Sequence, residues 1–181
     1  MPDGVTRHAP LDELEAGLTE IRRLPTEAGT VELIVRRPRE NEREVLEEGT
    51  LDSASGLVGD GWRNGSQADN PDTQLTLMNV RAASLAAGAR ERWPLAGDQL
   101  YVDFDLSEDN LPPGARLAIG SALLEVTSVP HTGCAKFSGR FGKDALRWVS
   151  TPDGRTLRLR GMYAKVIEAG TVRLGDEIRK V

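Results

Sequence analysis

The residues best suited to chemistry are the single cysteine, Cys134, and a histidine three positions before it, His131, in the stretch "PHTGCAKF". Only one other histidine occurs among the 181 residues. A cysteine thiolate is a strong nucleophile and a soft metal ligand, whereas an imidazole can move a proton near neutral pH. Cys134 and His131 are therefore the candidate catalytic residues, and Cys134 is also the candidate metal ligand.

The local pattern around Cys134 favours an ionised thiol. In "KFSGRFGKDALRWV" the side chains of Phe137, Phe141 and Trp148 share one helical face, which predicts a helix beginning at or just after Cys134. A thiol there lies near unpaired backbone N–H groups and the positive end of the helix dipole, and both stabilise a thiolate. Two alternatives stay open: Cys134 is a small buried apolar side chain, as free cysteines often are, and His131 is an ordinary surface-loop residue.

Other kinds of site are excluded by the residues present. A zinc or iron–sulfur site built from cysteine and histidine needs about four ligands, more than one cysteine and two histidines supply. The stretch "GRFGKD" lacks the spacing of a phosphate-binding loop and has Asp144 where a serine or threonine should follow the lysine. The G-x-S-x-G nucleophile motif does not occur.

Composition and length indicate a single globular domain. The chain has 39% hydrophobic and 28% charged residues, values typical of soluble globular proteins. No apolar run approaches the roughly 20 residues that cross a bilayer, and the N-terminus lacks a secretory signal pattern, so we expect a cytoplasmic protein with no membrane partner. The formal net charge is −5 and the arginines are dispersed, which argues against nucleic acid as a partner.

Many short strands are expected to position these residues. The stretch "DQLYVDFDLS" has a period of two that places Leu100, Val102, Phe104 and Leu106 on one face, and it is the clearest strand. Further strands are predicted in "TVELIVRRP", "EVLEEGTL", "QLTLMN", "ARLAIG", "ALLEVTSV", "LRLRGMYAKVIEAG" and "TVRLGDEI". Because only about three helices stand among them, the predicted fold class is mainly β: a mostly antiparallel β-barrel with a few peripheral α-helices.

Three features of the C-terminal part occur together: a single cysteine after a strand in "ALLEVTSVPHTGCAKF", the stretch "RGMYAKV", and the ending "TVRLGDEI". With these features the chain resembles the MOSC domain, a module found at the C-terminus of molybdenum-cofactor sulfurases and in stand-alone bacterial proteins. The resemblance spans residues 45–181 and implies a MOSC-like β-barrel there. Residues 1–44 are then expected to add a helix and a strand to one compact domain.

The resemblance implies that the matching cysteine, Cys134, either carries sulfur as a persulfide or ligates the molybdenum of a pterin cofactor, molybdopterin. The phosphate and pterin of such a cofactor need hydrogen-bond donors. The nearest basic side chains are Lys136, Arg140, Arg158 and Arg160, of which the last two alternate onto one face of a predicted strand. Each of these four is equally well explained as a solvated surface side chain.

Two further polar residues are looser matches to the family. Asp60 lies in a glycine-rich loop, "GLVGDGW", in which Gly61 and Trp62 replace the basic residue or histidine that often follows the aspartate. Asn79 ends a predicted strand, where lining a pocket and capping the following helix are equally good explanations. Asp60 and Asn79 are candidate cofactor-binding residues on this basis.

Three functions stay open from the sequence. In the first, Cys134 carries sulfur or binds the molybdenum cofactor, and a cysteine desulfurase is the expected partner of a sulfur carrier. In the second, the protein is a molybdenum-dependent reductase of N-hydroxylated compounds that needs a separate redox partner. In the third, the domain is non-enzymatic and Cys134 is structural or redox-sensing. The chain has no room for a pyridoxal-phosphate desulfurase domain, so pyridoxal phosphate is not expected, and the oligomeric state is not predicted.

Overall fold

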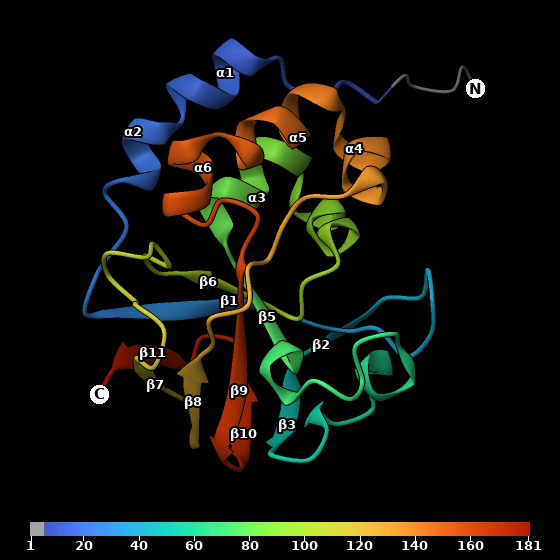
Figure 1. The fold of residues 1–181 in the computed structure, drawn as a ribbon, viewed down its shortest axis with the longest axis vertical. Coiled ribbons are helices and arrows are strands. Elements are labelled where there is room, and N and C mark those ends of the chain that lie inside the picture. Colours follow the sequence, from blue (N-terminus) through green and yellow to red (C-terminus); the bar gives the residue numbers. More distant parts are fainter. Residues whose placement is uncertain (1–5) are drawn as a thin grey trace.

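A closed barrel of seven strands forms the centre of the computed structural model, which describes residues 6–181 (Figure 1). Its strands are β1 (Ala28–Arg36), β5 (Leu75–Asn79), β6 (Leu100–Asp103), β7 (Arg116–Ile119), β8 (Ala122–Val126), β9 (Met162–Glu168) and β11 (Glu177–Lys180). The barrel closes because β1 pairs with both β6 and β11. The predicted, mostly antiparallel β-barrel is confirmed.

One neighbouring pair of strands departs from the antiparallel pattern. β5 and β6 run parallel, and a helical crossover between them returns the chain to the same end of the barrel. Outside the barrel, β2 (Glu44–Leu46) extends the sheet beside β1. A small second sheet contains β3 (Glu48–Asp52), β4 (Gly56–Leu57) and β10 (Gly170–Arg173).

The α-helices lie together above the barrel in the view of Figure 1. The described residues form α1 (Leu11–Ala16), α2 (Leu18–Ile21), α3 (Val80–Ala87), α4 (Ala135–Phe141), α5 (Lys143–Ser150) and α6 (Pro152–Thr156). They also form the 3₁₀ helices η1 (Gly61–Asn64), η2 (Pro71–Thr73) and η3 (Arg90–Ala96). Helices are thus more numerous than expected, partly because Gly142 divides the helix predicted after Cys134 in two and because α6 was not predicted. Between residues 6 and 181 no helix has both the length and the apolarity to cross a membrane.

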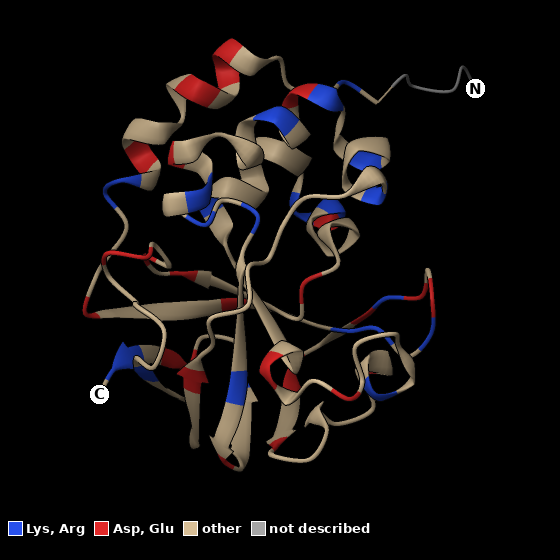
Figure 2. Ribbon diagram, in the orientation of Figure 1, with Lys and Arg blue, Asp and Glu red and all other residues tan. Residues whose placement is uncertain are grey.

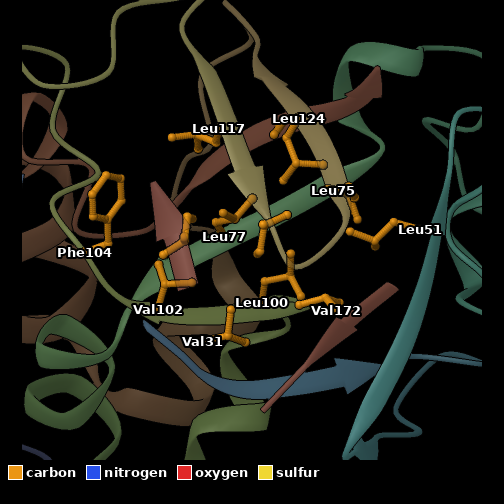
Figure 3. Close-up of a cluster of buried hydrophobic side chains, with 14 of the residues drawn as sticks. Val31, Leu51, Leu75, Leu77, Leu100, Val102, Phe104, Leu117, Leu124 and Val172 are labelled. Carbon is orange, nitrogen blue, oxygen red and sulfur yellow. The ribbon is translucent and has the colours of Figure 1, made fainter. Parts of the chain in front are cut away.

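Two hydrophobic cores share three of the barrel strands. The predicted alternation is confirmed in β6, because Leu100 and Val102 lie in the core inside the barrel (Figure 3). Phe104 and Leu106, beyond the end of the strand, belong to the same core. Tyr101 points the other way, into a second core between the barrel and the helices. β5 is buried along its whole length for the same reason. The strands that carry both cores are therefore fixed on two faces, and the loops at their ends are held firmly.

Candidate functional site

Cys134 is the N-cap residue of α4, so the predicted helix start is confirmed. Its backbone is extended, and its carbonyl oxygen accepts the first helical hydrogen bond from the Ser138 amide at 3.0 Å. The residue before it, Gly133, packs closely on α5: a Cβ atom there would lie 2.6 Å from Leu146 Cδ1. The side chain of Cys134 is exposed, so the alternative of a buried apolar cysteine is wrong.

Cys134 lines a cleft of about 720 Å³, here called the cysteine cleft. Its walls come from the connection after β1, the segment around η1, the end of η3, α4, and the residue Arg160 before β9. The basic side chains in its lining are Arg37, Arg39, Arg43, Lys136, Arg140 and Arg160. Glu40 is the one acidic residue in that lining. The protein is acidic as a whole, yet basic residues gather on α4 and on the connection after β1 (Figure 2).

Four arginines of the cysteine cleft are oriented by four consecutive backbone carbonyl groups at the end of η3. The donor and acceptor pairs are Arg43 to Pro94 O at 3.0 Å, and Arg140 to Leu95 O, Arg160 to Ala96 O and Arg37 to Gly97 O, each at 2.8 Å. The last carbonyl groups of a helix have no partner within it and carry partial negative charge, so they attract cations. The end of η3 therefore gathers four guanidinium groups into one place.

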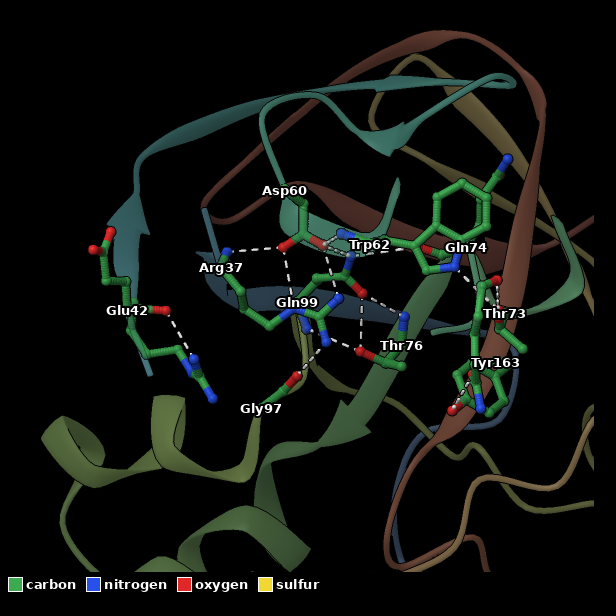
Figure 4. Close-up of polar contacts among 12 residues, drawn as sticks. Arg37, Glu42, Asp60, Trp62, Thr73, Gln74, Thr76, Gly97, Gln99 and Tyr163 are labelled. Carbon is green, nitrogen blue, oxygen red and sulfur yellow. Dashed lines mark hydrogen bonds and ion pairs between the residues drawn. The ribbon is translucent and has the colours of Figure 1, made fainter. Parts of the chain in front are cut away.

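Asp60 holds the guanidinium group of Arg37, and Gln99 holds Asp60 (Figure 4). The Asp60 carboxylate accepts hydrogen bonds from Arg37 Nε at 3.1 Å and Nη2 at 2.8 Å, a bidentate arrangement. Asp60 also accepts hydrogen bonds from the Trp62 amide and from Gln99 Nε2. Gln99 in turn accepts hydrogen bonds from Thr76. The carboxylate is buried, so it positions the guanidinium that lines the cleft without lining it itself.

A second buried carboxylate, Asp98, joins Arg160 to His131. Arg160 Nη1 lies 2.6 Å from Asp98 Oδ2, and His131 Nε2 lies 3.1 Å from Asp98 Oδ1. Burial raises the pKa of Asp98, but Arg160 and His131 outweigh it, so the pKa lies below its ordinary value. Burial and then the charge of Arg160 lower the pKa of His131, which is therefore neutral at pH 7 and donates from Nε2 to Asp98. The side chain of His131 is 10% exposed, so the surface-loop alternative is wrong.

The arginines of the cysteine cleft repel one another. Burial first, and then the charges of Arg140 and Arg37, lower the pKa of Arg43. Gly97 has a φ of +89°, and a Cβ atom on it would lie 3.7 Å from Arg43 Nη2 and 4.0 Å from Arg140 Nη1. The missing side chain leaves space between two positive groups. A bound anion would fill this space and relieve their repulsion.

The remaining predicted residues are dispersed. Lys136 Nζ pairs with Glu40 Oε1 at 2.7 Å, an exposed ion pair across the cysteine cleft. Asn79 is buried at the N-terminus of α3, where its Oδ1 accepts a hydrogen bond from the Ala82 amide, and it is not among the residues that line the cysteine cleft. His131 lines a different cavity, together with Gly133.

The prediction that Arg158 and Arg160 share a strand face is wrong. β9 begins only at Met162, and Arg158 has a φ of +49°, which no strand residue adopts. Arg158 Nη1 donates to the carbonyl oxygens of Leu106 and Leu111, whereas Arg160 reaches the end of η3. Arg160 therefore lines the cysteine cleft and Arg158 does not.

Arg37, Arg39, Arg43 and Asp98 are charged residues of the site that were not predicted from the sequence. Arg37 directly follows β1, and Asp98 directly follows Gly97 in the turn before β6. Polar residues at the ends of buried strands were the available signal. Arg43 carries no such signal, because only the folded chain shows that it reaches the carbonyl of Pro94.

Comparison with known proteins points to one family. Residues 83–179, more than half of the chain, match the family model described as MOSC domain. No curated protein sequence matches the chain. The YuaD protein from Bacillus subtilis has a similar structure, with a TM-score of 0.64 and 17% identity; the match covers 83% of this chain and 94% of that one.

Two other solved structures show the same likeness. YiiM from Escherichia coli has a TM-score of 0.55 and 21% identity, and the match covers 84% of this chain and 69% of that one. YiiM from Geobacillus stearothermophilus has a TM-score of 0.54 and 15% identity, and the match covers 84% and 73%. Identities this low show a common fold, and the function has to be argued from the site.

Proposed function

This chain belongs to the MOSC domain family, and we propose on that premise that it binds a molybdenum-containing pterin cofactor in the cysteine cleft. Cys134 would supply the protein's sulfur ligand to molybdenum. The observation that carries the proposal is that the only cysteine is exposed in a cleft of about 720 Å³ whose lining holds five arginines, one lysine and a single carboxylate.

The residues of the cleft fit such a group. Arg37, Arg43 and Arg140 are held by backbone carbonyl groups, so their remaining N–H groups are oriented in advance to bind phosphate. The buried Nε of Arg160 has no hydrogen-bond partner within residues 6–181, so this side chain retains an unused donor. Phe137 lies under Arg160, with the guanidinium carbon 5.0 Å from the ring centroid, and gives the cleft an apolar side.

The protein would contribute few ligands to the metal. No three His, Cys, Asp or Glu side chains cluster to hold a metal ion in the part of the chain that the structure describes. Cys134 therefore stands alone as the protein's sulfur ligand, and a soft metal such as molybdenum suits a thiolate. When bound, the cofactor would supply metal-centred redox chemistry, which no side chain of this protein can supply.

A sulfur carrier is the second candidate, because the exposure of Cys134 leaves its sulfur open to a donor protein. The thiolate of Cys134 would attack the outer sulfur of a persulfide on a cysteine desulfurase. The sulfur–sulfur bond of the donor breaks, the donor cysteine leaves as a thiolate, and Cys134 becomes the persulfide. The basic cleft then serves to hold the anionic acceptor.

The test is metal analysis of protein produced in a host that makes the molybdenum cofactor. We expect molybdenum and pterin to copurify with the wild-type protein in equal amounts, molybdenum to be lost in Cys134→Ala, and both to fall in Arg140→Ala. The matched control is Arg155→Ala, an exposed arginine outside the cysteine cleft that should retain both. Absence of molybdenum and pterin from the wild-type protein would contradict cofactor binding.

The persulfide is tested separately. Incubation with a cysteine desulfurase and cysteine should add one sulfur atom to the wild-type protein and none to Cys134→Ala, as read by intact-protein mass spectrometry. A persulfide without molybdenum would favour the sulfur carrier. Molybdenum together with reduction of an N-hydroxylated compound by an artificial electron donor would favour a reductase.

A further inference from the structure

A second cavity of about 570 Å³, here called the Arg158 cavity, is lined by the segment that leads to Cys134 but not by Cys134 itself. Residues 127–133 form one wall, and the C-terminal part of α5 together with α6 contributes another. Arg158, Arg160, Gly161 and Met162 line the cavity just before and at the start of β9, and Glu108 and Pro113 complete the lining. Its volume lies in the range of small-molecule sites, and the cofactor proposal leaves it unused.

The charges in the Arg158 cavity leave an excess of one positive group. Arg160 is already paired with the buried carboxylate of Asp98. Arg155 and Arg158 have no ion-pair partner among residues 6–181, and Glu108 is the one carboxylate in the lining. Two free guanidinium groups against one carboxylate suit a ligand with a single negative charge.

Arg158 is prepared to bind such a ligand. Its Nη1 donates to the carbonyl oxygens of Leu106 and Leu111 at 3.1 and 2.7 Å, which fixes the plane of the guanidinium. Its Nε and Nη2 have no hydrogen-bond partner among the described residues and are not enclosed by protein. Burial lowers the pKa of Arg158, and Glu108 only partly offsets this, so a bound anion would stabilise the charge.

The lining also has an apolar part, beside the polar side chains of Thr127, Ser128, His131, Thr132 and Ser150. Pro113, Val129, Val149 and Met162 face the cavity together with the arginines. An apolar lining with a few polar groups is typical of sites that bind the body of a small molecule by contact and orient it by one charged end. Inorganic anions would leave this apolar part of the cavity unfilled.

We propose that the Arg158 cavity binds a small carboxylate with an apolar body, held by Arg158 and Arg155. The site is separate from the cysteine cleft: Arg160 belongs to both linings, whereas Arg155 and Arg158 line only the Arg158 cavity and Arg37 and Arg140 line only the cleft. The proposal therefore does not depend on the cofactor.

The experiment is calorimetric titration of the metal-free protein with benzoate, hexanoate, phenyl phosphate and benzyl alcohol. We expect at least one of the two carboxylates to bind at least about tenfold more tightly than benzyl alcohol, because a charge-assisted hydrogen bond contributes roughly 1.5–3 kcal/mol. Phenyl phosphate has the same apolar body as benzoate but a second charge, and it should bind the cysteine cleft in preference.

Substitutions show which of the two cavities binds each compound. Arg158→Met should weaken carboxylate binding at least about tenfold, again the value of one charge-assisted pair. Arg158 also holds two backbone carbonyl groups, so Arg158→Met could disturb the fold as well as the site. Arg155 is exposed, and we expect Arg155→Ala to fold normally and to weaken carboxylate binding several-fold. Arg140→Ala should leave carboxylate binding unchanged and weaken phenyl phosphate.

Three results would overturn the proposal. The first is that neither carboxylate binds at millimolar concentration. The second is equal affinity for the carboxylates and benzyl alcohol. The third is carboxylate binding that is lost in Arg140→Ala but kept in Arg155→Ala, which would place the probe in the cysteine cleft. None of these results bears on whether molybdenum copurifies with Cys134.

Discussion

Two arginines of the site are each paired with one buried carboxylate. Asp60 binds Arg37 with both oxygens, and Asp98 divides its oxygens between Arg160 and His131. A buried ion pair contributes little net stability, but removal of one partner leaves an uncompensated charge and costs about 3–5 kcal/mol. The two aspartates therefore fix the direction of the guanidinium groups that line the cysteine cleft.

The paired state of His131 predicts a dependence of stability on pH. The folded protein holds the pKa of His131 below its ordinary value, so the unfolded chain binds a proton first as the pH falls. The stability that neutral His131 contributes to the folded protein is fully present above about pH 6.5, the pKa of a histidine in the unfolded chain. It is lost progressively as the pH falls below that value. The depressed pKa of Asp98 has the same sign but acts only below its ordinary value of 3.8.

We therefore expect His131→Gln to flatten the fall in unfolding free energy between pH 7 and pH 5, measured by urea denaturation at each pH. The glutamine amide can still donate to Asp98, but it does not titrate. His8→Gln is the matched control, because His8 is the other histidine and is exposed. An unchanged slope in His131→Gln would show that this histidine is not the group responsible.

At the scale of elements, the alternating pattern at 100–106 was read correctly, whereas a similar alternation at 157–160 was not. The period of two at 100–106 reports which side chains face the barrel core, so β6 was predicted. The alternation of Leu157 and Leu159 with Arg158 looks like a strand, yet the chain forms α6 and then turns. Thr151 before Pro152 was the available signal for that helix, since it places a cap before a proline at the first position.

Substitution of two glycines near the site by alanine is expected to change the unfolding free energy in opposite directions. Gly161 has a φ of +109°, and a Cβ atom there would lie 2.5 Å from the backbone oxygen of Leu77, so Gly161→Ala should lower the unfolding free energy by more than about 2 kcal/mol. Gly139 lies within α4, and a Cβ atom on it would meet no neighbouring atom within 4 Å, so Gly139→Ala should raise stability by about 0.5 kcal/mol.

Chemical denaturation of the two variants beside the wild-type protein tests this contrast. Gly139→Ala serves as the control for adding a methyl group to a glycine in this region. Equal effects of the two substitutions would mean that the tight approach of Gly161 to β5 does not constrain the segment between α6 and β9. The same comparison would then weaken the case that this segment holds Arg160 in the cysteine cleft.

The whole molecule combines a negative net charge with a concentrated positive cleft. Its formal charge of −5 would keep most anions away, whereas the arginines at the end of η3 attract them locally. This local concentration was not predictable from composition, because the arginines are dispersed along the sequence and only the fold brings them to four neighbouring carbonyl groups.

Phosphate should accordingly stabilise this acidic protein. At about ten times its dissociation constant a ligand of the folded state adds about 1.4 kcal/mol, so the melting temperature should rise in phosphate relative to chloride at equal ionic strength. Arg140→Ala should reduce the increase, and Arg147→Ala, at an exposed arginine outside both cavities, should preserve it. An equal rise in melting temperature in all three proteins would indicate a general effect of the salt and not phosphate binding in the cysteine cleft.

The arrangement of the two cores bears on how the protein unfolds. β1, β5 and β6 contribute side chains both to the core inside the barrel and to the core under the helices. The shared strands carry one core on each face, so the loss of either core would also disrupt the other. The helices and the barrel should therefore unfold as one cooperative unit. Trp93 and Trp148 lie against or within the helical core, and the barrel dominates the sheet content.

Tryptophan fluorescence and far-ultraviolet circular dichroism should therefore give the same midpoint and slope in urea. Cys134 provides an independent probe, because α4 packs on the helical core through Phe137 and Phe141 while the thiol is already exposed in the folded protein. Its alkylation should be rapid before the transition and change little across it. If fluorescence instead changes at lower urea than circular dichroism, the helices separate from an intact barrel, and the shared strands do not couple the two cores.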